Sequence, residues 1–136
     1  MNEQRPVRRI LIVDDSTTIR RMVRASLATI EAVDFVDAAS GLEALERLAL
    51  EPVALLVLDL NMPDVHGLEV LQFVRAHHAH RATPVIVLTT RGDDASRAAA
   101  LSAGANHYVT KPFAPQALAS LARDLLAPGV SNAPSR

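Results

Sequence analysis

Acidic, hydroxyl and basic side chains follow the apolar runs of this chain, in a combination suited to phosphoryl transfer. The set consists of Asp14 and Asp15 after one run, Asp59 after another, and Thr89 and Lys111 at the ends of two more. An aspartate carboxylate can attack phosphorus when nearby cations balance the charge of the transferring group. If the fold brings these side chains together, they indicate a phosphoacceptor site.

The apolar runs alternate with stretches of helical periodicity. The runs predict strands at residues 10–13, 33–38, 53–58, 85–88 and 107–110, and helices are expected between them and after the last. Strands that are apolar throughout belong to sheets covered on both faces. The pattern therefore predicts an α/β fold: a doubly wound, five-stranded parallel sheet of flavodoxin-like order 2-1-3-4-5, with five helices on both faces.

Helical spacing predicts which side chains of the first two helices face the core. The expected inward residues of the first helix are Ile19, Met22, Val23, Leu27 and Ile30, and on the second helix Leu42, Leu45 and Leu48 share one side. On the first helix, Arg20, Arg21 and Arg24 are then expected to lie mainly toward water.

The predicted strand order brings the polar residues to one place. Ligands of doubly wound sheets bind at the carboxyl ends of the strands, near the point where the strand order reverses. In the order 2-1-3-4-5 the first, third, fourth and fifth strands are neighbours. The five polar residues should therefore converge on one small pocket.

Three carboxylates in one pocket need a cation, because like charges a few ångströms apart repel one another. Hard oxygen ligands point to Mg²⁺, which keeps coordination positions for water and phosphate oxygens. Asp59 can then act as the nucleophile while Lys111 balances charge on the phosphoryl group. The Thr89 hydroxyl can donate a hydrogen bond to a phosphoryl oxygen.

Four motifs in this order closely resemble the response regulator receiver domain, the CheY-like family of two-component signalling. The motifs are ILIVDDS at residues 10–16, LDLNMPDVHG at 58–67, VIVLTT at 85–90 and YVTKPF at 108–113. The resemblance extends over about residues 8–127. By this resemblance Asp59 is the phosphoacceptor, and the metal ligands are Asp14, Asp15, Asp59 and the backbone carbonyl of Asn61.

The resemblance also implies a conformational switch. Thr89 and Tyr108 match the family's switch pair, in which the hydroxyl moves toward the phosphoryl group and the aromatic ring turns inward. Lys111 matches the lysine that pairs with the phosphoryl group, and the bond from Lys111 to Pro112 is expected to be cis. His66 departs from the family pattern, and Arg91 occupies a variable position beside the expected phosphoryl site, where side chains control the access of hydrolytic water.

The composition limits the organisation and the compartment. We expect one receiver domain at residues 1–127 and a tail at 128–136 whose Pro, Ser, Ala and Gly content is typical of disorder. The net charge of −1 gives no basic excess, so no direct nucleic-acid partner is expected. No apolar run has the length of a membrane span or signal peptide, and the chain has no cysteine, which agrees with a cytoplasmic location.

The expected function is that of a single-domain response regulator. A histidine kinase or phosphotransfer protein would phosphorylate Asp59 in a Mg²⁺-dependent step, and the chain would catalyse only its own phosphorylation and dephosphorylation rather than act as an enzyme on other substrates. The output would pass through protein contact on the surface between Asp93 and Leu126, because Thr89 and Tyr108 connect it to the site. A phosphorylation-dependent dimer is compatible with this scheme.

Three alternatives remain open at the level of sequence. A phosphatase of the haloacid dehalogenase type also forms an aspartyl phosphate, but it needs a second aspartate where this chain has Asn61. A flavodoxin-like flavin carrier would have a hydroxyl- and amide-rich loop in place of Asp14 and Asp15. The chain could also be a receiver module from a longer protein, or a phosphate relay.

Some residues also have simple structural interpretations. Asp14 and Asp15 could merely cap a helix, and Tyr108 could be a packed aromatic. The cluster of His77, His78 and His80 has no second ligand motif nearby, so a solvated helix end is expected there rather than a metal site.

Overall fold

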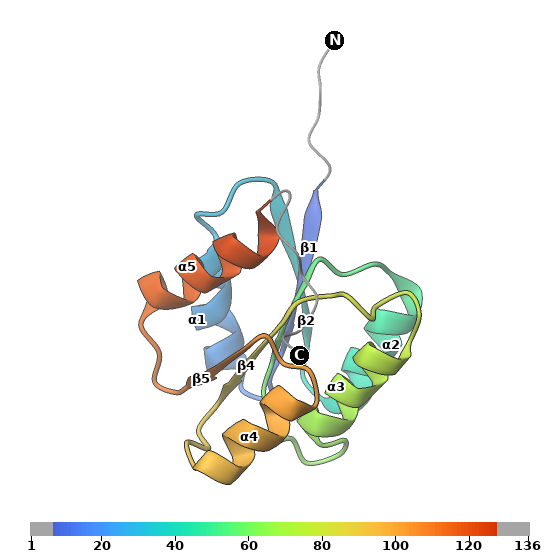
Figure 1. The fold of residues 1–136 in the computed structure, drawn as a ribbon. Helices are drawn as coiled ribbons and strands as arrows, with labels where there is room; N and C mark the ends of the chain where they lie inside the picture. The colour runs from blue at the N-terminus through green and yellow to red at the C-terminus, as the bar shows by residue number, and fades with distance from the viewer. Residues whose placement is uncertain (1–6, 128–136) are drawn as a thin grey trace.

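Strands and helices alternate along the chain in the computed structural model, which describes residues 7–127 (Figure 1). In chain order the elements are β1 (Arg8–Val13), α1 (Thr17–Leu27), β2 (Val33–Ala38), α2 (Gly41–Leu50), β3 (Leu55–Leu58), α3 (Gly67–Ala76), β4 (Val85–Thr89), α4 (Asp94–Ser102), β5 (His107–Thr110) and α5 (Pro115–Leu126). The tail predicted at 128–136 lies outside the described residues. Within the part that the structure describes, no helix has the length and apolar character needed to cross a membrane.

The five strands form one parallel sheet in the order β2-β1-β3-β4-β5, which confirms the predicted fold class. Helices α1 and α5 lie side by side on one face, and α2 and α3 pack together on the other. Apolar residues of α4 join the same core as those of α2 and α3.

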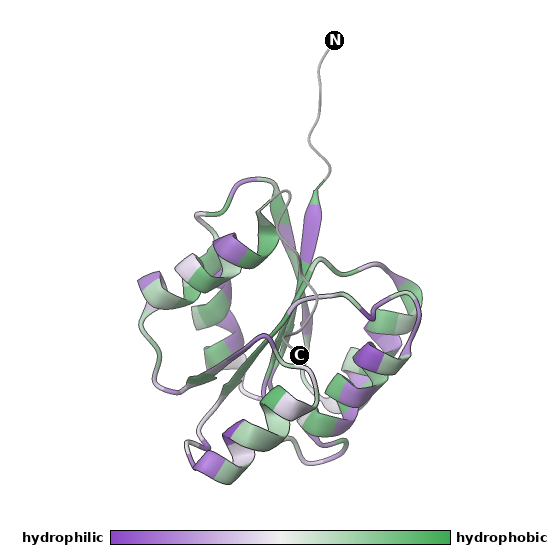
Figure 2. Cartoon of the chain, in the orientation of Figure 1, coloured by the Kyte–Doolittle hydropathy of each residue, from purple (hydrophilic) through white to green (hydrophobic). Residues whose placement is uncertain are grey.

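The central strands contribute side chains to two cores because alternate residues of a strand point to opposite faces. On β1, Leu11 and Val13 belong to the core under α2 and α3, whereas Ile10 and Ile12 belong to the core under α1 and α5. Figure 2 shows the central strands as mostly hydrophobic, apart from the hydrophilic first residues of β1, whereas the helices carry both hydrophilic and hydrophobic residues. Burial on both faces leaves the strand ends as the places where polar side chains can gather.

The inward faces of the first two helices are narrower than predicted. Met22 was expected to face the core, yet it is 43% exposed, and Leu42, which was placed on one side of its helix with the buried Leu48, is 55% exposed. On α1 the buried positions are Val23 and Leu27, and Met22 lies about 100° around the helix from Val23. The prediction that β3 begins at residue 53 was also wrong, because the strand begins at Leu55.

The histidine cluster after α3 is only partly solvated, which corrects the expectation of a solvated helix end. His77 and His78 are exposed, but His80 is only 4% exposed and its ring Nε2 lies 2.6 Å from the backbone carbonyl oxygen of Leu48. This hydrogen bond joins the loop before β4 to the end of α2. His80 is therefore a structural residue of the core.

Replacing this buried histidine tests its structural role. We expect His80→Ala to lower the free energy of unfolding by about 2 kcal/mol, because the Leu48 carbonyl would lose its partner in a buried position. Urea denaturation followed by circular dichroism measures the change. The exposed His78→Ala is the matched control and should have no effect, and equal losses in the two variants would contradict this assignment.

Candidate functional site

The polar residues selected from the sequence meet at the carboxyl edge of the sheet. Asp14 follows β1, Asp59 follows β3, Thr89 is the last residue of β4 and Lys111 follows β5. Backbone hydrogen bonds continue beyond the strands at this edge: the Asp59 N–H donates to the Val13 carbonyl at 2.9 Å, and the Lys111 N–H donates to the Thr89 carbonyl at 2.8 Å. The pairing of the strands therefore fixes the backbone positions from which these side chains extend.

Three carboxylates form a group that could hold a metal ion. One oxygen each of Asp14, Asp15 and Asp59 lies within 4.8 Å of the other two. Asp14 and Asp59 are 3% and 5% exposed, whereas Asp15 faces solvent. Two oxygens bound to one Mg²⁺ ion are about 3 to 4 Å apart, since Mg–O distances are about 2.1 Å. The donor set and its spacing therefore fit a small divalent cation after a slight closure.

Lys111 supplies a positive charge within the protein. Its Nζ donates to Asp14 Oδ2 at 2.7 Å and lies 3.7 Å from Asp59 Oδ2. It is the one lysine of the sequence, and its side chain is largely buried. One ammonium against three carboxylates leaves a formal excess of two negative charges, which is the charge that a divalent cation would neutralise.

The environment of Asp59 disfavours its ionised form. Burial raises the pKa of the Asp59 carboxyl above its ordinary value, and the charge of Asp14 raises it further. Lys111 opposes this rise, as do hydrogen bonds from the Asn61 N–H and the Thr89 hydroxyl. A charged Asp59 is therefore under electrostatic stress until another cation enters the site.

Thr89 and Tyr108 lie on neighbouring strands and share a loop partner. Thr89 is fully buried, and its hydroxyl oxygen accepts a hydrogen bond from the Arg91 N–H at 3.4 Å. The buried Tyr108 donates its hydroxyl to the Arg91 carbonyl at 2.5 Å, and the Arg97 guanidinium carbon lies 4.9 Å from the Tyr108 ring centroid. Burial raises the pKa of Tyr108. The ring occupies an inward position.

Two further predicted positions lie next to these side chains. The Lys111–Pro112 peptide bond is cis. The Asn61 N–H donates to Asp59 Oδ1 at 3.4 Å, and the Asn61 side chain is exposed. Asn61 therefore meets the site through its backbone.

One residue that supports the site was missed in the sequence. Arg20 was assigned to the wet side of its helix, but it donates through Nη1 to the Asp14 carbonyl at 2.7 Å and through Nε to Asp37 Oδ2 at 3.1 Å. Its side chain is mostly buried. An arginine six positions after Asp14, on the first helical turns, is the signal that could have indicated a contact back to the strand end.

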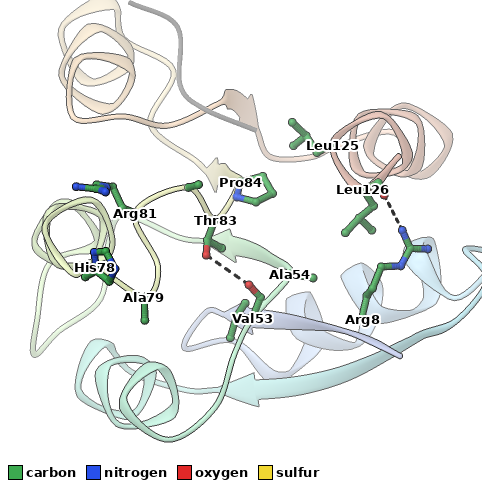
Figure 3. A pocket seen from close by; sticks show the side chains of 11 residues that line it. Arg8, Val53, Ala54, His78, Ala79, Arg81, Thr83, Pro84, Leu125 and Leu126 are labelled. Atoms are coloured by element: carbon green, nitrogen blue, oxygen red, sulfur yellow. Dashed lines mark hydrogen bonds between the residues drawn. The ribbon is translucent and has the colours of Figure 1, made fainter. Parts of the chain in front are cut away.

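Several hollows lie outside the carboxylate group, and two of them concern residues discussed above. One, of about 400 Å³, lies at the opposite end of the sheet, where Arg8 bonds the Leu126 carbonyl and Thr83 bonds the Val53 carbonyl (Figure 3). Another, of about 270 Å³, lies between the starts of α3 and α4 and is lined partly by His66, which departs from the family pattern, and by Arg91, the position noted beside the expected phosphoryl site.

Comparison with known proteins agrees with the fold and identifies the family. The family model of the response regulator receiver domain matches residues 10–123. A chemotaxis protein CheY homolog of Campylobacter jejuni is 40% identical over 122 residues, which cover 89% of this chain and 94% of that protein.

Two solved structures are similar over nearly their whole length. The chemotaxis response regulator CheY4 of Vibrio cholerae has a TM-score of 0.80 and 31% identity, covering 88% of this chain and 99% of that one. A CheY-like response regulator receiver domain protein of Methanospirillum hungatei has a TM-score of 0.79 and 31% identity, covering 88% and 94%.

The fold is that of a doubly wound α/β protein, and its group of carboxylates lies at the carboxyl edge of the sheet, near the point where the strand order reverses. The chain belongs to the response regulator receiver family, whose members act in signalling, and its relatives are CheY-like.

Removing the Asp59 charge should stabilise the metal-free protein. Because the folded chain raises the pKa of this carboxyl above 3.8, ionisation opposes folding above the raised pKa, and the opposition is lost below 3.8, where folded and unfolded chains both hold the proton. We expect Asp59→Asn to raise the free energy of unfolding by roughly 1 kcal/mol at about pH 7 in EDTA.

This gain should shrink as the pH falls toward the ordinary value of the carboxyl. Urea titrations of both proteins at a series of pH values measure it. If the increase in the free energy of unfolding did not depend on pH, the effect of Asp59→Asn would come from the packing of the side chain and not from the loss of its charge.

Removing the internal cation should have the opposite effect. We expect Lys111→Met to lower the free energy of unfolding in EDTA by roughly 3 kcal/mol, because two buried carboxylates lose their counter-charge. Added Mg²⁺ should then stabilise the variant more than the native protein. Thermal unfolding with and without Mg²⁺ measures both effects, and an equal shift by Mg²⁺ in the two proteins would contradict the role of Lys111 as counter-charge.

Proposed function

We propose that this chain accepts a phosphoryl group on Asp59 in a Mg²⁺-dependent reaction and signals by protein contact. The observation that carries the proposal is the group of three carboxylates beside a buried lysine, at the carboxyl edge of a receiver-family sheet. Asp14, Asp15, Asp59 and the Asn61 carbonyl would hold the metal. When bound, Mg²⁺ would neutralise negative charge on the phosphoryl oxygens and on the carboxylates.

The residues of the chain have distinct tasks in this reaction. An Asp59 carboxylate oxygen attacks the phosphorus of a phosphohistidine, a new O–P bond forms, and the P–N bond breaks with its electron pair going to the imidazole. Lys111 is close enough to Asp59 to pair with a phosphoryl oxygen. The Thr89 hydroxyl, which bonds the Asp59 carboxylate, can turn to donate to the phosphoryl group instead.

The change at Thr89 would reach the surface through Tyr108. The Arg91 backbone accepts from Tyr108 and donates to Thr89, so a movement of the Thr89 hydroxyl alters the loop that holds the aromatic ring. Tyr108 and α4 both belong to the segment from Asp93 to Leu126, so a change at the ring would alter the surface that this segment forms. We therefore assign the output to that surface.

The proposal extends to partners and compartment. A histidine kinase or phosphotransfer protein is the phosphodonor, residues 1–127 act as one receiver unit in the cytoplasm, and a downstream protein, or a second copy of the chain, binds the phosphorylated form. Neither nucleic acid nor membrane is a direct partner. The chain catalyses only its own phosphorylation and dephosphorylation, and Asn61 and Arg91, which flank the expected phosphoryl site, influence the lifetime of the aspartyl phosphate.

Mass spectrometry tests the chemistry directly. Incubation with Mg²⁺ and acetyl phosphate should add one phosphoryl group, and the adduct should be absent in EDTA and in Asp59→Asn, which lacks the nucleophilic oxygen pair. The variant is the matched control because only the carboxylate changes. Labelling of Asp59→Asn at the native rate would refute the site assignment.

Turnover of a generic phosphomonoester distinguishes the phosphatase alternative. A receiver should release no phosphate from such a substrate, because Asn61 cannot serve as a general acid. Sustained release of phosphate that depends on Asp59 would show that the chain is a phosphatase and would refute the proposed signalling function.

A further inference from the structure

We propose that Asp64 is a positioning residue for the metal side of the site, because its carboxylate ties the loop after β3 to the first turn of α2. The inference rests on the function proposed above, in which the Asn61 carbonyl of the same loop ligates Mg²⁺. Asp64 is itself exposed and is not a member of the carboxylate group. Its effect on the metal would act through the loop.

The carboxylate of Asp64 accepts two backbone hydrogen bonds from α2. The Gly41 N–H donates to Oδ1 at 3.1 Å and the Leu42 N–H donates to Oδ2 at 3.0 Å. These amides belong to the first helical turn and have no partner within the helix. Hydrogen bonds from backbone amides, that of Leu42 foremost, lower the pKa of Asp64 to about 2. A residue more than twenty positions later in the chain thus caps α2.

Close backbone packing reinforces this contact at both ends of the loop. A Cβ atom at Gly41 would lie 2.5 Å from the Cβ and the carbonyl oxygen of Val65. At the other end, the Gly67 N–H donates to the Leu60 carbonyl at 2.9 Å, and a Cβ at Gly67 would lie 2.6 Å from the Leu60 Cα. Glycine is required at both positions because backbone packs there directly against backbone.

Asn61 lies between these two anchors. Its N–H donates to Asp59 Oδ1 at 3.4 Å, so loop and nucleophile are already in contact. Without the Asp64 carboxylate, the anchor on α2 would be lost and the Asn61 carbonyl would sample more positions. Metal binding would then include the cost of ordering the loop, whereas the reaction of the metal-loaded protein would be unchanged.

The test separates metal affinity from chemistry. We expect Asp64→Ala to weaken Mg²⁺ binding about tenfold by calorimetry without phosphodonor, and to raise the Mg²⁺ concentration for half-maximal phosphorylation by about the same factor. The phosphorylation rate at saturating Mg²⁺ should stay within about twofold of the native rate. Asp64→Asn keeps one oxygen acceptor and should show a smaller loss of affinity.

A second cap of the same helix provides the control. Ser40, the N-cap of α2, accepts from the Glu43 N–H at 3.1 Å, a hydrogen bond that does not involve the loop. Ser40→Ala should lower the urea concentration at the midpoint of unfolding and leave Mg²⁺ affinity unchanged. Native affinity in Asp64→Ala, or an equal loss in Ser40→Ala, would overturn the inference. Failure of the native protein to take up phosphate would instead refute the proposed function, since calorimetry needs no phosphoryl transfer.

Discussion

Repulsion among three carboxylates at one edge of an apolar sheet is the constraint on which the arrangement of the site depends. Two of the carboxylates are buried, and the sheet leaves them little water. Lys111 neutralises part of this negative charge from within the chain, and a divalent cation could neutralise the remainder. Repulsion among the carboxylates would therefore favour the binding of a divalent cation in the proposed function.

The two-sided burial of the sheet explains why the charge gathers where it does. Strands covered on both faces have no room for polar side chains along their length, so catalytic groups stand in the loops just past the strand ends. The strands hold those loops in register through backbone bonds such as that from Asp59 to Val13. Rigid apolar layers thus place carboxylates that would otherwise move apart.

Much of this arrangement could be predicted because it follows from local patterns and one topological rule. Apolar runs located the strands, and the doubly wound order located the meeting point of Asp14, Asp59 and Lys111. The residues that support the site were harder to predict. Arg20 appeared to be solvent-facing by periodicity, yet its guanidinium group turns back to the Asp14 carbonyl. Asp64 contacts a helix start 22 residues earlier, and no local pattern encodes that pairing.

The same limit applies to His80, whose partner Leu48 lies 32 residues away. In each case a long polar side chain reaches a backbone group that only the assembled fold brings near. Helical periodicity describes the direction of the Cβ atom, and it says little about where the end of an arginine or a histidine ring will find its hydrogen bond.

The single lysine of the sequence has a consequence for chemical modification. Amine-directed acylation can reach only Lys111 and the amino terminus, and at Lys111 it would convert the internal cation into a neutral amide beside Asp14 and Asp59. An acetyl donor that reached this amine would therefore remove the internal counter-charge of the carboxylates. The largely buried Nζ, held by Asp14, would slow that acylation, so the ion pair also protects the amine on which the site relies.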